Sequence, residues 1–252
     1  MTRLRPLWIA GRFLSRLPFP DPGETSPHET GCSVPWYPFV GLLMGGPAAL
    51  AASVIAEAPV DVAAVLVLML WVWSSGALHL DGLADSADAW IGGLGSRERT
   101  LEIMKDPRSG PAAVTLIGLV LIAKWVALKT LILAGVIWPL LVVPMLARAQ
   151  LPLLLLTTPY ARRQGMAADQ FNHLPRRAAW LSVLAAGVVT LVLGDWSGPA
   201  LILAALALYL VARRAMLARL SGFTGDTAGA LVELTETLAL LLCSLLLGLS
   251  QG

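Results

Sequence analysis

The amino-acid sequence predicts an all-α, polytopic integral membrane helix bundle with about seven transmembrane helices and a cytoplasmic N-terminus. Composition is the first observation: of 252 residues, 57% are hydrophobic and 13% are charged, and the mean hydropathy is +0.74. Soluble domains carry roughly 25% charged and 45–50% apolar residues, so lipid is expected around this chain. The other two observations are the length of the apolar runs and the placement of cations between them.

Seven apolar runs are expected to cross the membrane, because a hydrocarbon core about 30 Å thick takes roughly 20 apolar residues per helix. They are residues 36–56, 62–80, 112–132, 136–157, 178–194, 199–212 and 228–249. The fifth and sixth runs are short, with Gly194 to Pro199 as their turn. Within 112–157 the turn contains only Ala134, Gly135 and apolar neighbours, so six or eight helices stay open.

The distribution of lysine and arginine gives the orientation. With the N-terminus inside, segments 1–35, 81–111, 158–177 and 213–227 hold 15 of the 18 cations, and the outer turns hold none. Cytoplasmic loops carry the excess of Lys and Arg, so the N-terminus is placed inside and the C-terminus outside. Residues 1–35 are then a cytoplasmic N-terminal segment and 81–111 the main cytoplasmic loop.

No break in composition suggests a second domain, so the whole chain, 1–252, is expected to be a single transmembrane catalytic domain. The net charge of +2 is too small to suggest a nucleic-acid partner. Cys32 and Cys243 are far apart and fit no metal-ligand or disulfide spacing.

Three aspartates follow the second run, in HLDGLADSADAWIGG (79–93). Asp81, Asp85 and Asp88 stand at i, i+4 and i+7, which places them on one face of a helix. Like charges at this spacing destabilise a helix unless a cation neutralises them. Mg²⁺ prefers hard oxygen ligands and shares its coordination with substrate phosphates. A magnesium site is therefore favoured over the alternative, a solvated acidic helix end.

A second acidic patch surrounds the start of the last run. Asp226 precedes the run, Glu233 lies two turns further along the same face, and Glu236 is nearby. Carboxylates inside a membrane segment are costly and normally face a bundle interior or a wet cavity. A helix cap by Thr224, Asp226 or Thr227 would explain Asp226 alone. Asp226 and Glu233 are therefore candidate metal ligands together with the first patch.

Candidate phosphate-binding groups lie in the loop 97–110 and in the fourth run. Lys105, Asp106 and Arg108 belong to a segment of mixed charge that also suits a helix crossed by salt bridges. Arg148 is costly to bury without an anion, which is either one of the acids or a substrate phosphate. Lys124 has the same two interpretations.

The residues together indicate transfer of a phosphoryl-type group from a nucleotide-activated donor. In such reactions a metal neutralises the diphosphate, and positioning supplies most of the catalysis. His79 can serve as a base, although a histidine beside a helix end is more often a structural hydrogen-bonding group. No triad, nucleotide loop or zinc spacing rises above chance.

Six sequence blocks resemble the cobalamin synthase family, whose members are also called adenosylcobinamide-GDP ribazoletransferases. They occur in the family's order and cover essentially the whole chain. The blocks are FLSRLPFP (13–20), WYPFVGLLMGG (36–46), LHLDGLADSADAW (78–90), LEIMKDPRSG (101–110), PYARRQGMA (159–167) and TGDTAGALVELTE (224–236). The strings DGLADSAD and GDTAGALVELTE are the specific ones.

The resemblance implies condensation of adenosylcobinamide-GDP with α-ribazole or its 5′-phosphate. The products would be adenosylcobalamin or its 5′-phosphate, and GMP. It also implies Mg²⁺ and the bacterial cytoplasmic (inner) membrane as location, with the lipid bilayer around the chain.

The roles of individual residues are a hypothesis that goes beyond the resemblance. Asp81, Asp85 and Asp88 are the expected catalytic residues, and with Asp226 or Glu233 they would hold Mg²⁺ on the diphosphate. Asp88 is the candidate base for the attacking hydroxyl. Lys105, Arg108 and Arg148 would hold phosphates on the cytoplasmic side.

Two other functions stay open on sequence. A CDP-alcohol phosphotransferase also uses an Asp-rich DG motif, but Asp85 and Ser86 stand where its Ala and Arg would fall. A transporter using intramembrane acids is the second, although no chain of acids reaches the outer turns. A homo-oligomer is possible, with no interface legible in the sequence.

Overall fold

The computed structural model describes residues 4–55, 58–162 and 166–250. The regular structure in these ranges is helical, apart from an isolated bridge between Tyr160 and Phe223. The short helical turns are η1 (Val34–Trp36) and η2 (Asp195–Ser197). The α-helices are α1 (Arg5–Leu14), α2 (Pro27–Ser33), α3 (Tyr37–Val54), α4 (Val60–Ser75), α5 (Leu78–Gly92), α6 (Arg97–Ile103), α7 (Pro111–Leu133), α8 (Trp138–Thr157), α9 (Met166–Asn172), α10 (Arg176–Leu193), α11 (Gly198–Leu220) and α12 (Gly225–Ser250).

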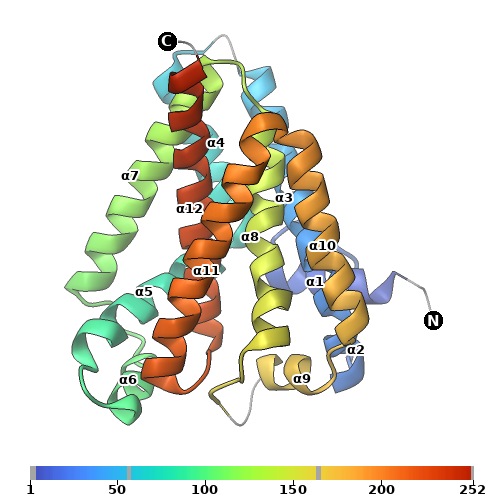
Figure 1. The fold of residues 1–252 in the computed structure, drawn as a ribbon, viewed down its shortest axis with the longest axis vertical. Coiled ribbons are helices and arrows are strands. Elements are labelled where there is room, and N and C mark those ends of the chain that lie inside the picture. Colours follow the sequence, from blue (N-terminus) through green and yellow to red (C-terminus); the bar gives the residue numbers. More distant parts are fainter. Residues whose placement is uncertain (1–3, 56–57, 163–165, 251–252) are drawn as a thin grey trace.

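The long helices run along one axis, with α6 and α9 near one end and the C-terminus at the other (Figure 1). In the described residues, six segments are long and apolar enough to cross a membrane, and α4 with α5 makes a seventh if this bent pair counts as one span. The six are Pro27–Val54, Pro111–Leu133, Trp138–Thr157, Arg176–Leu193, Asp195–Leu220 and Gly225–Leu249. The predicted all-α polytopic bundle is confirmed.

The surface of the bundle is apolar, as a lipid-facing surface should be. Large hydrophobic side chains such as Ile122 of α7, Leu184 of α10 and Leu203 of α11 are exposed. Exposed apolar side chains on helices of this length are the feature that a membrane-spanning bundle requires. Helix α8 is instead mostly buried and lies in the middle of the bundle (Figure 1).

Helices α3 and α8 pack closely because small residues face α8. Gly41 and Gly45 of α3 are four residues apart, and their α-carbons lie against the backbone of α8 at Pro144 and Leu140. Small residues at this spacing let two membrane helices approach at backbone distance. This contact anchors the centre of the bundle.

The second predicted run, 62–80, is wrong at its C-terminal end. Helix α4 ends at Ser75, and α5 leaves it at an angle of 84°. Gly76 and Ala77 both adopt left-handed backbone angles, with φ of 60° and 59°. Such a conformation is easy for glycine and strained for alanine, so only Gly76 marks the bend in the sequence. The acidic segment of the predicted loop is therefore a helix with its own direction.

Two of the arginines that were predicted to lie on the inner side have structural roles. Arg97 donates to the carbonyl of Leu220 at 2.8 Å, and Arg213 donates to that of Thr157 at 2.8 Å. These carbonyls end helices α11 and α8, where the backbone lacks intrahelical donors. The sixth run, predicted as 199–212, is in fact longer, because α11 continues to Leu220. The end of the first predicted run, at residue 56, lies outside the described residues.

Candidate functional site

The three aspartates of the first acidic patch lie on α5, which packs against the start of α12. Gly82 makes this approach possible: a β-carbon there would lie 2.7 Å from the carbonyl oxygen of Asp226 and 3.1 Å from its α-carbon. Asp81 directly precedes Gly82, so this close approach brings the first acidic patch next to Asp226. The prediction that the two patches meet at one end of the bundle holds for Asp81 and Asp226.

Asp226 is held by an arginine from the loop before α9. The Arg162 side chain donates to its carboxylate at 2.7 Å, and the Thr224 hydroxyl donates to the same oxygen at 3.3 Å. The cap of α12 is made by other residues, since the backbone N–H of Thr227 donates to the Thr224 hydroxyl at 3.2 Å. Asp226 is therefore not needed as a cap, and its carboxylate faces a cavity.

The carboxylates around α5 repel one another. Asp85 is close enough to feel the negative charges of Asp81, Asp226 and Asp88, and Arg162 is the cation that partly offsets them. Asp81 and Asp85 have no salt bridge or side-chain hydrogen bond to any other described residue. Such a group of acids is stabilised by a bound cation or by a cationic partner.

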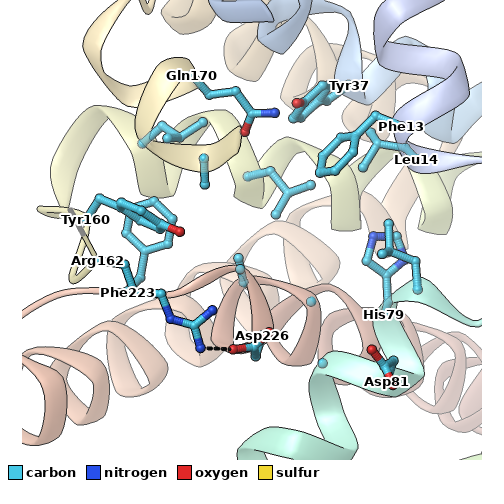
Figure 2. A pocket seen from close by; sticks show the side chains of 18 residues that line it. Phe13, Leu14, Tyr37, His79, Asp81, Tyr160, Arg162, Gln170, Phe223 and Asp226 are labelled. Carbon is cyan, nitrogen blue, oxygen red and sulfur yellow. Dashed lines mark hydrogen bonds and ion pairs between the residues drawn. The ribbon is translucent and has the colours of Figure 1, made fainter. Parts of the chain in front are cut away.

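A cavity of about 330 Å³ opens beside these acids, and we call it the α5–α12 cavity (Figure 2). Asp81 and Asp226 lie on one side of it, with Arg162 next to Asp226. The opposite side carries Phe13 and Tyr37. The cavity is lined by Phe13, Leu14, Tyr37, Leu78, His79, Asp81, Gly82, Leu151, Leu155, Tyr160, Arg162, Ala167, Gln170, Phe223, Gly225, Asp226, Ala228 and Gly229. It therefore combines an acidic side with apolar and aromatic walls.

Asp88 has a structural contact that the sequence did not suggest. Its two carboxylate oxygens accept hydrogen bonds from the backbone N–H groups of Gly110, at 2.5 Å, and Ala113, at 3.0 Å. These groups belong to the first turn of α7, where backbone donors lack intrahelical partners. Asp88 thus caps α7 from the neighbouring helix, and its predicted role as a base has to coexist with this contact.

Asp88→Ala is expected to lower the free energy of unfolding by about 1 kcal/mol, because the start of α7 loses its cap. Asp88→Asn keeps one of the two acceptor oxygens and should retain part of that stability. Thermal inactivation of the two purified variants measures the difference. If Asp88→Asn is stable and yet inactive, its carboxylate has a chemical role beyond the cap.

Two of the predicted phosphate-binding groups of the 97–110 loop, Asp106 and Arg108, lie at a second hollow of about 1040 Å³ between α5, α6 and α7. We call it the α5–α7 groove. Arg108 donates to Asp106 at 2.6 and 2.9 Å, and these side-chain bonds, with one from the Arg108 backbone, lower the pKa of Asp106 to about 2. Both line the groove, as does Asp88. Lys105 is exposed.

Glu233 and Arg148 both form ion pairs inside the bundle, and for Arg148 this is one of the two interpretations that the sequence left open. Glu233 forms a buried ion pair with Lys124, and Arg148 forms one with Glu236, with Lys124 also 2.5 Å from Glu236. Glu233 lies two turns beyond Asp226, about 10 Å along the helix. Because these charges neutralise one another inside the bundle, Glu233 is not placed to share a metal with Asp226. Arg148 is likewise not placed to hold a phosphate.

The described residues contain no group of three or more His, Cys, Asp or Glu side chains arranged to hold a metal ion. The carboxylates of α5 and α12 instead fit a site in which a metal ion is bound jointly by the protein and by a substrate phosphate. Mg²⁺ is usually bound by one or two carboxylates and completes its shell with water and substrate phosphates. Asp81 and Asp226 offer such carboxylates, and the repulsion around Asp85 gives a reason for a cation. The set fits Mg²⁺ brought together with a phosphorylated substrate.

Gly82→Ala tests whether the contact between α5 and α12 matters. The added methyl group would meet the Asp226 backbone, which cannot move without shifting a helix. We expect turnover to fall by about tenfold to a hundredfold, because small displacements of catalytic groups are costly. Gly46→Ala is the control, since a β-carbon there meets nothing within 4 Å. Equal activity of both variants would contradict the importance of the contact.

Sequence reasoning missed Arg162 as a site residue. Arg162 was considered only as one of the cations used to predict the orientation. It belongs, however, to the block PYARRQGMA, which is part of the family resemblance. The motif was the available signal. The partner of an arginine in a loop becomes known only from the folded structure, in which this loop packs against α12.

The fold and site together define a polytopic helical membrane protein with an acidic site at one end of its bundle. A model of the cobalamin-5-phosphate synthase family matches residues 6–244. The chain belongs to this family, as the sequence blocks predict.

Relatives agree over nearly the full length. An adenosylcobinamide-GDP ribazoletransferase of Pseudomonas putida is 52% identical over 247 residues, 98% of this chain and 99% of the relative. Proteins of the same name from Pseudomonas entomophila and Ectopseudomonas mendocina are 51% identical over 231 residues and 50% over 238. These matches cover 92% and 94% of this chain, and 95% and 97% of the relatives. No solved structure matches the chain.

Proposed function

We propose that this protein joins adenosylcobinamide-GDP to α-ribazole or α-ribazole 5′-phosphate. The products are adenosylcobalamin or its 5′-phosphate, and GMP. Membership of the family and the names of the relatives support the substrates. The structural observation that carries the proposal is the meeting of Asp81 and Asp226 beside Arg162 at the α5–α12 cavity.

Asp81 and Asp226 would hold Mg²⁺ against the diphosphate of the donor. The chemistry that Mg²⁺ supplies when bound is neutralisation of the negative charge on that diphosphate. Arg162 is placed to contact a phosphate oxygen from the same side, since guanidinium groups bind phosphate well. It takes the role first given to Arg148.

The proton of the attacking hydroxyl needs an acceptor at the site. Asp85 is a better candidate than Asp88, because the oxygens of Asp88 already accept two backbone hydrogen bonds. Asp85 has no such partner among the described residues and lies between Asp81 and Asp88 on the acidic face of α5. A general base must be within hydrogen-bond reach of the proton that it removes.

The reaction would take place on the cytoplasmic side of the bacterial inner membrane. The acids lie at the same end of the bundle as the arginines whose number predicts the inner face. Arg97, Arg162 and Arg213 all contact groups at this end. Both substrates would then reach the site from the cytoplasm without crossing the membrane.

The test is GMP release by the purified protein in liposomes that contain both substrates. Release is expected with Mg²⁺ and should cease when the metal is chelated. Omitting α-ribazole is the control for simple hydrolysis of the donor. Cation flux across the liposome membrane without GMP release would instead favour the transporter.

A further inference from the structure

His79 lies at the start of α5 and contacts a buried arginine. The Nδ1 atom of its ring is 3.2 Å from the Arg148 side chain. A guanidinium group has only N–H donors, so Nδ1 has to be the acceptor in this contact. A neutral ring that accepts at Nδ1 carries its hydrogen at Nε2. Arg148 therefore sets the tautomer of His79.

The charges around Arg148 favour the same neutral form. Lys124 and Arg148 carry two positive charges, and Glu233 and Glu236 carry two negative charges. The net charge of the cluster is zero when His79 is neutral. A protonated ring would add an unpaired charge in the bundle interior and would lose the acceptor that Arg148 uses.

The hydrogen at Nε2 has no partner in the described part of the chain. His79 is only 3% exposed, and its Nε2 atom is buried without a hydrogen bond. Buried donors are nearly always satisfied, so an exception calls for an explanation. His79 lines the α5–α12 cavity, near Asp81 (Figure 2). A ligand in that cavity would supply the missing acceptor.

The size and walls of the cavity limit what that ligand is. At about 330 Å³ it lies at the small end of ligand pockets, which span roughly 300–1,000 Å³. Phe13, Leu151 and Phe223 offer apolar and aromatic surface, and Asp81 and Asp226 lie on the acidic side. A flat aromatic base attached to a ribose fits this combination. The corrinoid-bearing donor is much larger than the cavity.

We infer that the α5–α12 cavity binds the acceptor nucleoside and that His79 donates a hydrogen bond to it from Nε2. This inference rests on the proposed function, because it decides which of the two substrates occupies the cavity. The base would lie against the aromatic wall, and the ribose would extend toward Asp81 and Asp226. His79 is then a binding residue for one substrate. The ion pair between Glu236 and Arg148 holds its ring in the tautomer that donates from Nε2.

Two substitutions of similar polarity separate binding from folding. Both His79→Asn and His79→Gln can accept from Arg148, but only the longer glutamine places an N–H near the position of Nε2. His79→Asn is expected to weaken α-ribazole binding about three- to tenfold, the effect of one neutral hydrogen bond. His79→Gln should restore most of it. His28→Asn, on an exposed surface of α2, is the control.

Calorimetry with α-ribazole alone measures binding without turnover, and the KM for each substrate is then measured in the active enzyme. The KM for α-ribazole should rise in His79→Asn while that for adenosylcobinamide-GDP stays constant. Unchanged α-ribazole binding, or an equal loss for both substrates in both variants, would overturn the inference. Wild-type protein that binds α-ribazole through His79 but releases no GMP would overturn the proposed function alone.

Discussion

Asp81→Asn is expected to lower the rate of GMP release at saturating substrate by at least about a hundredfold. The substitution removes one negative charge and leaves the shape of the side chain almost unchanged, so α5 should keep its contact with α12. Metal-based neutralisation of a diphosphate contributes several kcal/mol to such a reaction, and each 1.36 kcal/mol corresponds to about a factor of ten. Asp226→Asn should show a similar loss, because its carboxylate lies at the same cavity.

The dependence of the rate on Mg²⁺ concentration distinguishes a metal ligand from a residue that merely shapes the site. Residual activity of Asp81→Asn should require a higher Mg²⁺ concentration than the wild type. Asp195→Asn is the matched control: Asp195 is exposed in η2, far along the chain from the site, and asparagine tolerates its φ of 46°. Near-normal GMP release by Asp81→Asn would exclude a metal role for this residue.

The architecture followed from the sequence because its causes are local or additive. Helix length reflects the thickness of the bilayer, so it can be predicted without any tertiary contact. Helix order likewise places Asp81 and Asp226 at one end of the bundle, because Asp81 follows the second predicted span and Asp226 precedes the seventh. The direction of α5 could not be predicted from the sequence, because nothing in the sequence indicates that Ala77 adopts a left-handed conformation.

The assignment of the acids was only partly predictable. Asp81, Asp88, Asp226 and Glu233 look alike in sequence, as carboxylates at inner helix ends or inside a span. Asp88 proved to cap α7, and Glu233 to pair with Lys124, through contacts between residues 22 and 109 positions apart. Local sequence patterns do not rank such partners, because the distances between the side chains depend on how α5, α7 and α12 are packed.

The buried charges of the bundle interior give the second large expected effect. Glu236→Gln should lower the free energy of unfolding by about 3–5 kcal/mol, because it leaves Arg148 and Lys124 with one carboxylate between them. Arg148 and Lys124 are each 1% exposed, so water cannot replace the missing partner. The Trp71 indole also loses the charged acceptor that it contacts at 2.8 Å. Thermal inactivation in detergent or liposomes measures the loss.

An exposed ion pair provides the control. Lys129 and Asp61 are 2.6 Å apart with side chains 38% and 55% exposed, and Lys129→Met should cost only about 0–1 kcal/mol. Replacing the four charged residues of the cluster together, with Lys124→Met, Arg148→Met, Glu233→Leu and Glu236→Leu, should recover much of the stability that Glu236→Gln loses, since no buried charge then lacks a partner.

The same fourfold variant separates stability from binding. His79 would keep its place on α5 but lose the donor that sets its tautomer, so α-ribazole binding should stay weak while the fold recovers. If binding recovered together with stability, the cluster would serve the fold alone and Arg148 would have no part in orienting His79. A recovered fold with weak binding would mean that these membrane-buried charges are retained for the substrate, at some cost to the packing of the bundle.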